Sequence, residues 1–524
     1  MNFLSRRFLV GLAASLLLLA AGAVAAAAEP KLPEGAVLVS GGYADVTGDG
    51  TVDQVYLISK RMQADADYMS EHGLLIIEGK EGAQLLHWLG PESAGYPGTI
   101  EFGKLDPGKS TDILINLPSG GSGGITTAMP VSVEGGKLKV LADLYALNDS
   151  PAIDLIVGDK YKLLATYDGI EYSIDLLRGS ASDEAGTYKG IFDEQGRKVG
   201  TIKPVIDPVS ATEMRDVNND GMSELITYRA VWAVYHANTV AIARSVWGWE
   251  GDAIKPRFAS VKQIYGPEDY AKYVAAISTN DPVEALKLAS DKYVSAFEAA
   301  PPAWRSEAFR IYRSYAYAVC GKITEALPPA NADDATMQKV YQMSDRLSAV
   351  GAGIFYVGEG TLAAVPDPKF QLAKFEKYLQ RDAVEFLLLE AVEVYDIWAM
   401  DGALLIQQEE VGNRLHDWEY FLLSHPGSSF SQYAMQQYVS KLTAFLLGID
   451  NSPNFSYSDG SINPGVIASL EKYVREFGNT PSAATVAGAL GIMKEGNGKL
   501  NQDMIDRILK LLPQPVSKED TTGK

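Results

Sequence analysis

The spacing of apolar residues changes near residue 265, and this change separates two kinds of predicted structure. Between about residues 35 and 262, short apolar runs such as 55–58 and 113–115 alternate with Gly, Asp and Pro. Runs of this length between turn residues predict short β-strands. Beyond residue 265, apolar residues recur every three or four positions, which predicts amphipathic helices.

We therefore expect a multidomain chain in which an all-β part is followed by an all-α part. The predicted β-rich domain covers residues 33–262 and forms either a small or partial propeller or a sandwich. The pairs Gly135-Gly136 and Asp168-Gly169 between apolar runs predict hairpin turns. The predicted helical domain, a helical repeat or a bundle, covers residues 266–512, and Asp281 before Pro282 predicts the start of one of its helices.

The N-terminus has the layout of a secretory signal. Arg6 and Arg7 precede an apolar run over residues 8–19, and small residues follow up to Ala28. We expect residues 1–28 to be a cleaved signal peptide, with an uncleaved anchor helix as the alternative. The protein is then secreted, periplasmic or at the cell surface, and no membrane span is expected after cleavage. The polar tail, residues 513–524, is predicted to be disordered.

Charge and cysteine content limit the partners that the chain can bind. The formal net charge is −20 over 524 residues, so binding to nucleic acid or to an anionic membrane surface is disfavoured. Cys320 is the single cysteine, which excludes an intrachain disulfide and a thiolate metal site. Its place beside an apolar helix stripe predicts a buried, unreactive thiol.

Two segments repeat one pattern of oxygen-bearing side chains. A glycine at the sixth position permits a sharp turn, and oxygens at positions 1, 3, 5, 7 and 9 can surround a hard cation such as Ca²⁺. In the first loop the predicted ligands are Asp45, Thr47, Asp49, the Thr51 carbonyl and Asp53. In the second loop they are Asp216, Asn218, Asp220, the Met222 carbonyl and Glu224. A metal-free Asp-Gly turn is the alternative for each.

A degenerate copy of the pattern lies between these two loops, at residues 105–113. We call it the intermediate loop and align its Asp106 with Asp45 and Asp216. Lys109 within this copy would repel a cation, so we expect the turn without the metal. The separations of the three copies suggest repeated β units of about 55 residues.

These loops carry a resemblance to a known family. Residues 36–260 resemble the FG-GAP/VCBS-like repeats of exported bacterial proteins, whose signature is a DxNxDGxxDL loop that runs into a strand. The second loop matches that signature almost fully, and the first departs from it at Thr47. The resemblance implies calcium-stabilised β-sheet units, often propeller blades, and no particular reaction. The helical half more weakly resembles tetratricopeptide-type repeats, through the similar segments 418–426 and 470–478.

The sequence predicts no catalytic residues and no residues that bind an organic cofactor. None of its five histidines forms a zinc-binding pattern, and no phosphate or dinucleotide fingerprint is present. Our first hypothesis is an exported calcium-binding interaction or scaffold protein that binds a protein or glycan outside the cytoplasm. A secreted hydrolase acting on cell-wall or polysaccharide material and a structural envelope or surface protein are the alternatives.

Overall fold

The computed structural model describes residues 31–513 except 64–65, 80–81, 122–123, 143, 150, 178–184, 237, 426–427 and 479. The predicted signal peptide, residues 1–28, lies outside the described residues. Residues 514–524 of the predicted disordered tail also lie outside the described residues.

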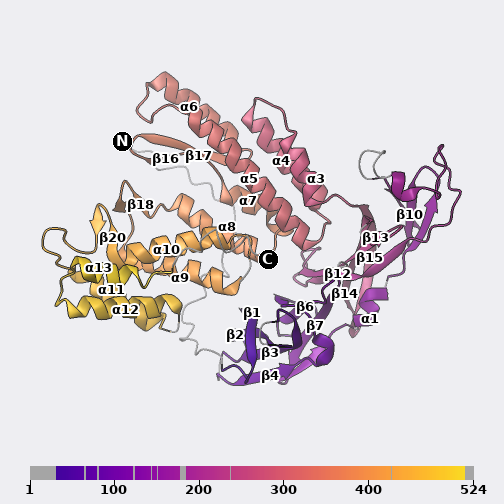
Figure 1. Cartoon of the computed structure of the whole chain (residues 1–524), viewed down its shortest axis with the longest axis horizontal. Helices are drawn as coiled ribbons and strands as arrows, with labels where there is room; N and C mark the ends of the chain where they lie inside the picture. The colour runs from indigo at the N-terminus through magenta and orange to yellow at the C-terminus, as the bar shows by residue number, and fades with distance from the viewer. Residues whose placement is uncertain are drawn as a thin grey trace. The chain divides into compact units, whose positions relative to one another are not determined.

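Strands dominate the first half of the chain and helices the second, which confirms the predicted β-then-α order (Figure 1). The strands of the first half are β1 (Ala36–Ala44), β2 (Asp53–Arg61), β3 (Met69–Ile77), β4 (Gln84–Trp88), β5 (Thr99–Gly103), β6 (Asp112–Pro118), β7 (Thr126–Glu134), β8 (Lys137–Val140), β9 (Asp154–Gly158), β10 (Lys162–Tyr167), β11 (Ile170–Asp175), β12 (Val205–Arg215), β13 (Glu224–Trp232), β14 (Thr239–Glu250) and β15 (Ala253–Gln263). Short helices η1 (Pro91–Ser93), α1 (Leu144–Asp149) and η2 (Ala185–Tyr188) interrupt them.

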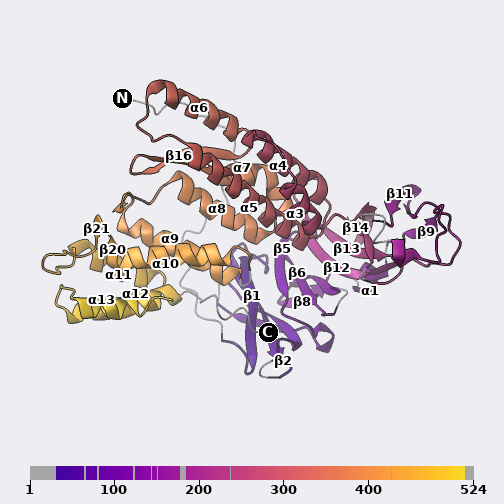
Figure 2. The ribbon, with the colours of Figure 1, turned by 45° about the horizontal axis from the view of Figure 1, so that its top comes forward.

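Within the described residues, three sheets share one topology. Each has four antiparallel strands in chain order, namely β1-β2-β3-β4, β5-β6-β7-β8 and β12-β13-β14-β15. The first strands of the second and third sheets, β5 and β12, contact each other and lie side by side in Figure 2. Successive hairpins of this kind agree with the predicted turn signals.

The three sheets are buried against one another through alternate residues of their inner strands. Ile113 and Ile115 of β6 pack into a cluster with the first sheet, whereas Leu114 packs into a cluster with the third sheet. Side chains of a strand alternate between the two faces of its sheet, so β6 is buried on both. This explains why its sequence is a continuous apolar run.

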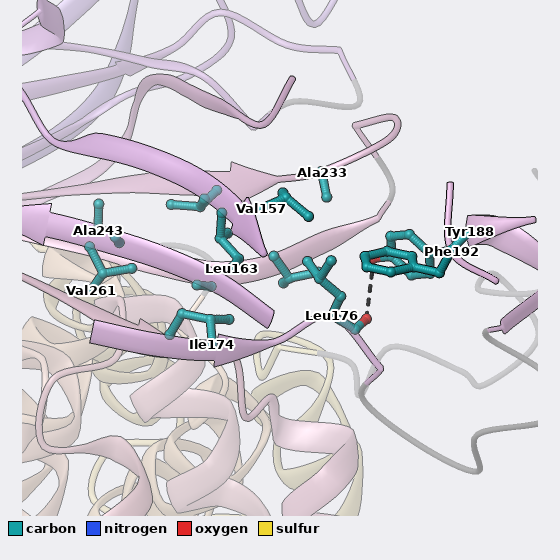
Figure 3. Packing of buried hydrophobic residues seen from close by; sticks show 13 residues of the cluster. Val157, Leu163, Ile174, Leu176, Tyr188, Phe192, Ala233, Ala243 and Val261 are labelled. Atoms are coloured by element: carbon teal, nitrogen blue, oxygen red, sulfur yellow. Dashed lines mark hydrogen bonds between the residues drawn. The ribbon is translucent and has the colours of Figure 1, made fainter. Parts of the chain in front are cut away.

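A smaller sheet, with the strand order β11-β10-β9, packs on the third four-stranded sheet. Figure 3 shows Leu163 and Ile174 of this sheet packed beside Val261 and Ala243 of β15 and β14. At the end of the same cluster, the Tyr188 hydroxyl donates a hydrogen bond of 3.2 Å to the Leu176 carbonyl.

The second half is mainly helical. Its helices are α3 (Pro267–Ala275), α4 (Pro282–Phe297), α5 (Pro302–Ala326), α6 (Asp334–Ser348), α7 (Pro368–Phe375), η3 (Glu376–Tyr378), α8 (Arg381–Tyr395), α9 (Gln408–Ser424), α10 (Ser431–Leu447), α11 (Pro464–Glu476), α12 (Pro481–Glu495) and α13 (Gln502–Leu509). Short two-stranded ribbons are β16 (Ala352–Gly358) with β17 (Thr361–Pro366), β18 (Ala399–Met400) with β19 (Ala403–Leu404), and β20 (Gly448–Ile449) with β21 (Ser452–Pro453).

Two predictions for this half are confirmed at single residues. Helix α4 begins at Pro282, and the Asp281 side chain caps it by accepting the Val283 N–H at 3.1 Å. Cys320 is buried on α5, and burial raises the pKa of its thiol to about 12. None of the helices in the described part of the chain is long and apolar enough to cross a membrane.

Internal contacts group the described residues into two compact units. The larger unit contains residues 32–401 and 420–435, and the smaller unit contains residues 402–419 and 436–513. The smaller unit has its own core, which includes Trp418, Leu442, Phe445, Leu470 and Tyr473. The chain therefore passes between the units within its helical half.

Candidate cation site at the loops that open three strands

Each predicted loop connects the first two strands of a four-stranded sheet. The first loop lies between β1 and β2, and the second loop lies between β12 and β13. The backbone is left-handed at Gly50, with φ of 86°, and at Gly221, with φ of 87°. These are the sixth positions, where the pattern required glycine.

The last residue of the first loop holds the loop together. Asp53 is fully buried, and its Oδ2 accepts hydrogen bonds from the Val46 N–H at 2.9 Å, the Thr47 N–H at 2.9 Å and the Thr47 hydroxyl at 3.0 Å. Its Oδ1 accepts the Gly79 N–H at 3.0 Å. A carboxylate has about four lone-pair sites, so these four donors use the capacity of Asp53.

The other carboxylates of the first loop also bind its backbone. Asp45 accepts the N–H groups of Gly48, Asp49 and Gly50 at 2.7, 3.1 and 2.9 Å, and Asp49 accepts the Thr51 N–H at 2.8 Å. The structure thus brings the predicted ligands of the first loop into a closed set of side-chain to backbone bonds. It does not bring them together as a cage with free oxygens.

The second loop is arranged differently. The Asn218 amide nitrogen donates to Asp220 Oδ2 at 2.9 Å and to Glu224 Oε1 at 3.2 Å. Oxygens at loop positions 5 and 9 therefore converge on a single point, and that point is held by a hydrogen-bond donor. The Met222 N–H and the Asn218 amide hold the pKa of Asp220 below its ordinary value.

Asp216 stays outside this convergence. Its carboxylate accepts the N–H groups of Asp220 and Gly221 at 3.2 and 2.9 Å and so shapes the turn. Glu224 also accepts the Val217 N–H, at 3.0 Å, in the way that Asp53 accepts the Val46 N–H. The acid at the ninth position of each loop is thus a candidate ligand. It also holds the loop closed by accepting a backbone N–H from the loop's start, and we call this second role the clamp.

The intermediate loop has the same clamp, and this corrects its predicted alignment. Asp112 Oδ2 accepts the N–H groups of Leu105 and Asp106 at 2.7 and 3.0 Å, so these residues correspond to Val46 and Thr47. Lys104 therefore occupies the position of Asp45, and the alignment that placed Asp106 there is wrong. The loop spans nine residues like its neighbours, and the prediction placed its first position two residues too late.

The three loops form a hydrogen-bonded row. The Thr111 N–H donates to the Asp45 carbonyl at 2.7 Å, and the Ser223 N–H donates to the Lys104 carbonyl at 2.7 Å. Both donors precede the clamping acid, and both acceptors are the first residue of the neighbouring loop. The same bond thus joins each loop to the next, and we call residues 45–53, 104–112 and 216–224 the loop row.

The donor set of the second loop fits a hard cation better than that of the first. The second loop offers carboxylate and amide oxygens, the ligands that Ca²⁺ takes, and two of its carboxylates already face one point. Among the described residues, no three His, Cys, Asp or Glu side chains gather closely enough to hold a metal ion. A cation here would therefore depend on Asn218 and on backbone carbonyls as well as on carboxylates.

A charged cluster that the sequence analysis missed lies between the third sheet and α5. Arg305 is 1 % exposed and forms a bidentate ion pair with Glu213 of β12, while its Nη1 also donates to the Tyr228 hydroxyl at 3.1 Å. Burial opposes ionisation of Glu213, but the charge and hydrogen bonds of Arg305 outweigh it and lower the pKa. The two residues are 92 positions apart, so no local pattern could reveal the pair.

Glu101 of β5 adds a second carboxyl to this cluster. Its Oε2 accepts the Met214 N–H at 3.3 Å, and its Oε1 accepts from the Asn116 amide at 3.4 Å. Burial, and next the negative charge of Glu213, raise the pKa of Glu101 to about 7. No local sequence pattern around Glu101 indicates this shift.

Comparison with known proteins identifies a family match within the β-rich part and a similar bacterial protein. Residues 154–262, which run from β9 to β15, match the family described as YybI C-terminal domain. The chain is 25 % identical over 215 residues to the uncharacterized protein YybI of Bacillus subtilis (strain 168). That similarity covers 40 % of this chain and 78 % of YybI.

Solved structures with some similarity are rhamnogalacturonan lyases. The lyase YesW shares 15 % sequence identity over 45 % of this chain and 36 % of its own chain, with a TM-score of 0.21. The lyase PL11 of Bacillus licheniformis shares 12 % identity over the same shares of the two chains, also with a TM-score of 0.21. The chain thus spans about a third of the length of these enzymes.

Proposed function

We propose that the protein is an exported interaction or scaffold protein that binds a protein or glycan outside the cytoplasm, and that calcium binds the second loop. The proposal extends to the FG-GAP/VCBS-like character of the β units. Its main support is the convergence of Asp220 and Glu224 on the Asn218 amide. An amide that donates to two carboxylates occupies a position that suits a cation.

The loop row supports the interaction part of the proposal. Three sheets present equivalent loops joined by equivalent hydrogen bonds, and the loop tips at Asp49, Lys109 and Asp220 are exposed. Loops held by a rigid scaffold commonly carry binding functions. A calcium ion in the second loop would fix one end of the row, because it would replace a weak amide contact with stronger ligand bonds.

Calorimetry and thermal unfolding of the chain from residue 29 test the calcium part. We expect heat on titration with CaCl₂, and a stabilisation of about 2.7 kcal/mol over chelator-treated protein at 100 times the dissociation constant. Asp220→Asn should weaken binding, whereas Asp252→Asn, in an exposed turn of the same sheet, should not. Absence of both the heat and the stabilisation at millimolar calcium would rule out the calcium site.

The first loop stays a predicted calcium site, and the bonds of Asp53 argue for a metal-free turn there. Titration stoichiometry separates the two possibilities. One ion per chain that is lost in Asp220→Asn assigns binding to the second loop, and two ions would restore the first loop as a site.

A further inference from the structure

An arginine from β15, the fourth strand of the same sheet, reaches the second loop. Arg257 of β15 places its Nη1 at 3.3 Å from Glu224 Oε1, the same oxygen that accepts from the Asn218 amide. Its Nη2 donates to the Trp249 carbonyl at 2.8 Å. The side chain of Glu224 is 4 % exposed and that of Arg257 is 45 % exposed, so a partly exposed cation lies against a buried carboxylate.

Strand β14 leaves room for the guanidinium of Arg257 because residue 248 is a glycine. Gly248 of β14 lies under Arg257, and a Cβ at this residue would be 2.2 Å from the guanidinium carbon. Any side chain there would force the arginine to move. Glycine at position 248 thus allows the arginine head to lie against the backbone of β14 and reach Glu224.

A small cavity adjoins the contact. It has a volume of about 70 Å³ and is lined by Asp220, Glu224, Trp249 and Arg257, together with Met222, Ser223 and Gly248. Both acidic side chains on which the calcium proposal depends therefore border the same space as the arginine.

We propose that Arg257 is the built-in counter-cation of the second loop and that calcium displaces it from Glu224. This inference rests on the proposed calcium function. A dication and a guanidinium that share one carboxylate oxygen repel each other strongly at such short range. Calcium binding therefore breaks the Arg257–Glu224 contact and frees the guanidinium from the Trp249 carbonyl.

Displacement makes the arginine a regulator of calcium affinity. In the calcium-free protein Arg257 satisfies the buried Glu224, so the loop keeps its shape without metal. In the calcium-bound protein the released guanidinium faces solvent. The loop can in this way exist in two charge-balanced states, and the free energy of the Arg257 contact lowers the apparent affinity for calcium.

Calcium titration of variants of the chain from residue 29 tests the inference. Arg257→Gln should bind calcium roughly ten-fold more tightly than the wild type, because the competing cation is gone. Lys255→Gln removes an equal charge from an exposed position of the same strand and should change the affinity roughly two-fold or less by general electrostatics.

A second variant tests the displacement without changing the charge of the protein. Gly248→Ala should push the guanidinium off the strand and also tighten calcium binding, even though Arg257 is still present. Tryptophan fluorescence gives an independent readout, since the calcium-induced signal from the region of Trp249 should be smaller in Arg257→Gln than in the wild type. Trp249→Phe identifies that signal.

The outcomes separate this inference from the function on which it rests. Calcium binding by the wild type with unchanged or weaker binding by both Arg257→Gln and Gly248→Ala overturns the displacement and leaves the calcium site standing. No binding by the wild type or by either variant removes the calcium site itself. Tighter binding by Lys255→Gln, equal to that of Arg257→Gln, also contradicts displacement, because it assigns the effect to net charge.

Discussion

At the scale of single residues, the acids of this chain differ in the number and kind of hydrogen-bond donors that contact their carboxylates. Asp53 accepts four hydrogen bonds within its sheet, whereas Glu224 shares one oxygen between the Asn218 amide and Arg257. Glu101 accepts two long bonds and lies near another carboxylate. The two similar loop sequences therefore give one acid, Asp53, whose hydrogen-bonding capacity is filled. In the other, Glu224, one carboxylate oxygen is shared by two donors.

Asp53→Asn should destabilise the protein whether or not calcium is present. The introduced amide nitrogen must face at least one backbone N–H, and the charge that strengthened the remaining bonds is lost. We expect a loss of roughly 1–3 kcal/mol in the free energy of unfolding, measured by denaturant titration with chelator. Asp49→Asn, an exposed change in the same loop, should cost less than about 0.5 kcal/mol. Equal small losses for both variants would show that Asp53 is no clamp.

Glu101 should make stability depend on pH near neutrality. Its pKa is raised from 4.5 to about 7 in the folded protein, so the folded state binds more protons than the unfolded state between these values. The free energy of unfolding should therefore fall as pH rises from about 5 to 8, with roughly 2 kcal/mol from this one group. The contribution of Glu101 to stability is fully present at pH values below its unfolded pKa and is lost as the pH rises through about 7.

Glu101→Gln isolates this contribution, because its amide oxygen can still accept the Met214 N–H. We expect the variant to match the wild type near pH 5 and to be more stable than the wild type at pH 8. Asp112, whose pKa burial raises to about 6, keeps a residual slope in both proteins. Parallel stability curves for the two proteins over this pH range would contradict the shift at Glu101.

At the scale of elements, what the sequence revealed was local. The first and second loops and the strands after them follow from residues within ten positions of one another, and so does the Asp281 cap of α4. The intermediate loop begins two residues earlier than predicted, because Lys104 and not an acid stands at its first position. The ion pairs Arg257–Glu224 and Arg305–Glu213 join separate elements, and only the fold brings them together.

The Arg305–Glu213 pair should couple helix α5 to strand β12 energetically. Arg305→Met leaves Glu213 buried beside Tyr228 with less compensation, and Glu213→Leu leaves a buried guanidinium. Each single change should cost roughly 3–5 kcal/mol, measured by denaturant unfolding, and the double variant should cost much less than the sum. Additive losses would show that the two side chains stabilise the protein independently. Arg310→Met, at an exposed pair within α5, serves as the control and should change little.

At the scale of the whole molecule, the β-rich part and the first helices share one compact unit. The larger unit includes the three sheets and α3 to α8, and the Arg305–Glu213 pair lies within it. The predicted boundary near residue 265 marks a change of secondary structure. It also separates the two partners of this buried ion pair, so a fragment of residues 33–262 lacks Arg305.

The effect of Glu213→Gln should therefore depend on how much of the chain is present. In the full chain it removes a charge partner of Arg305 and should cost roughly 3 kcal/mol. In a fragment of residues 33–262 Arg305 is absent while Glu213 keeps its contacts with Arg215 and Tyr228, so the same change should cost only about 1 kcal/mol. Chemical unfolding of the four proteins, followed by far-UV circular dichroism, measures both differences. Equal losses of unfolding free energy in the full chain and the fragment would show that Arg305 does not cause the effect of Glu213→Gln. A fragment without a cooperative transition would show that the sheets need the helices to fold.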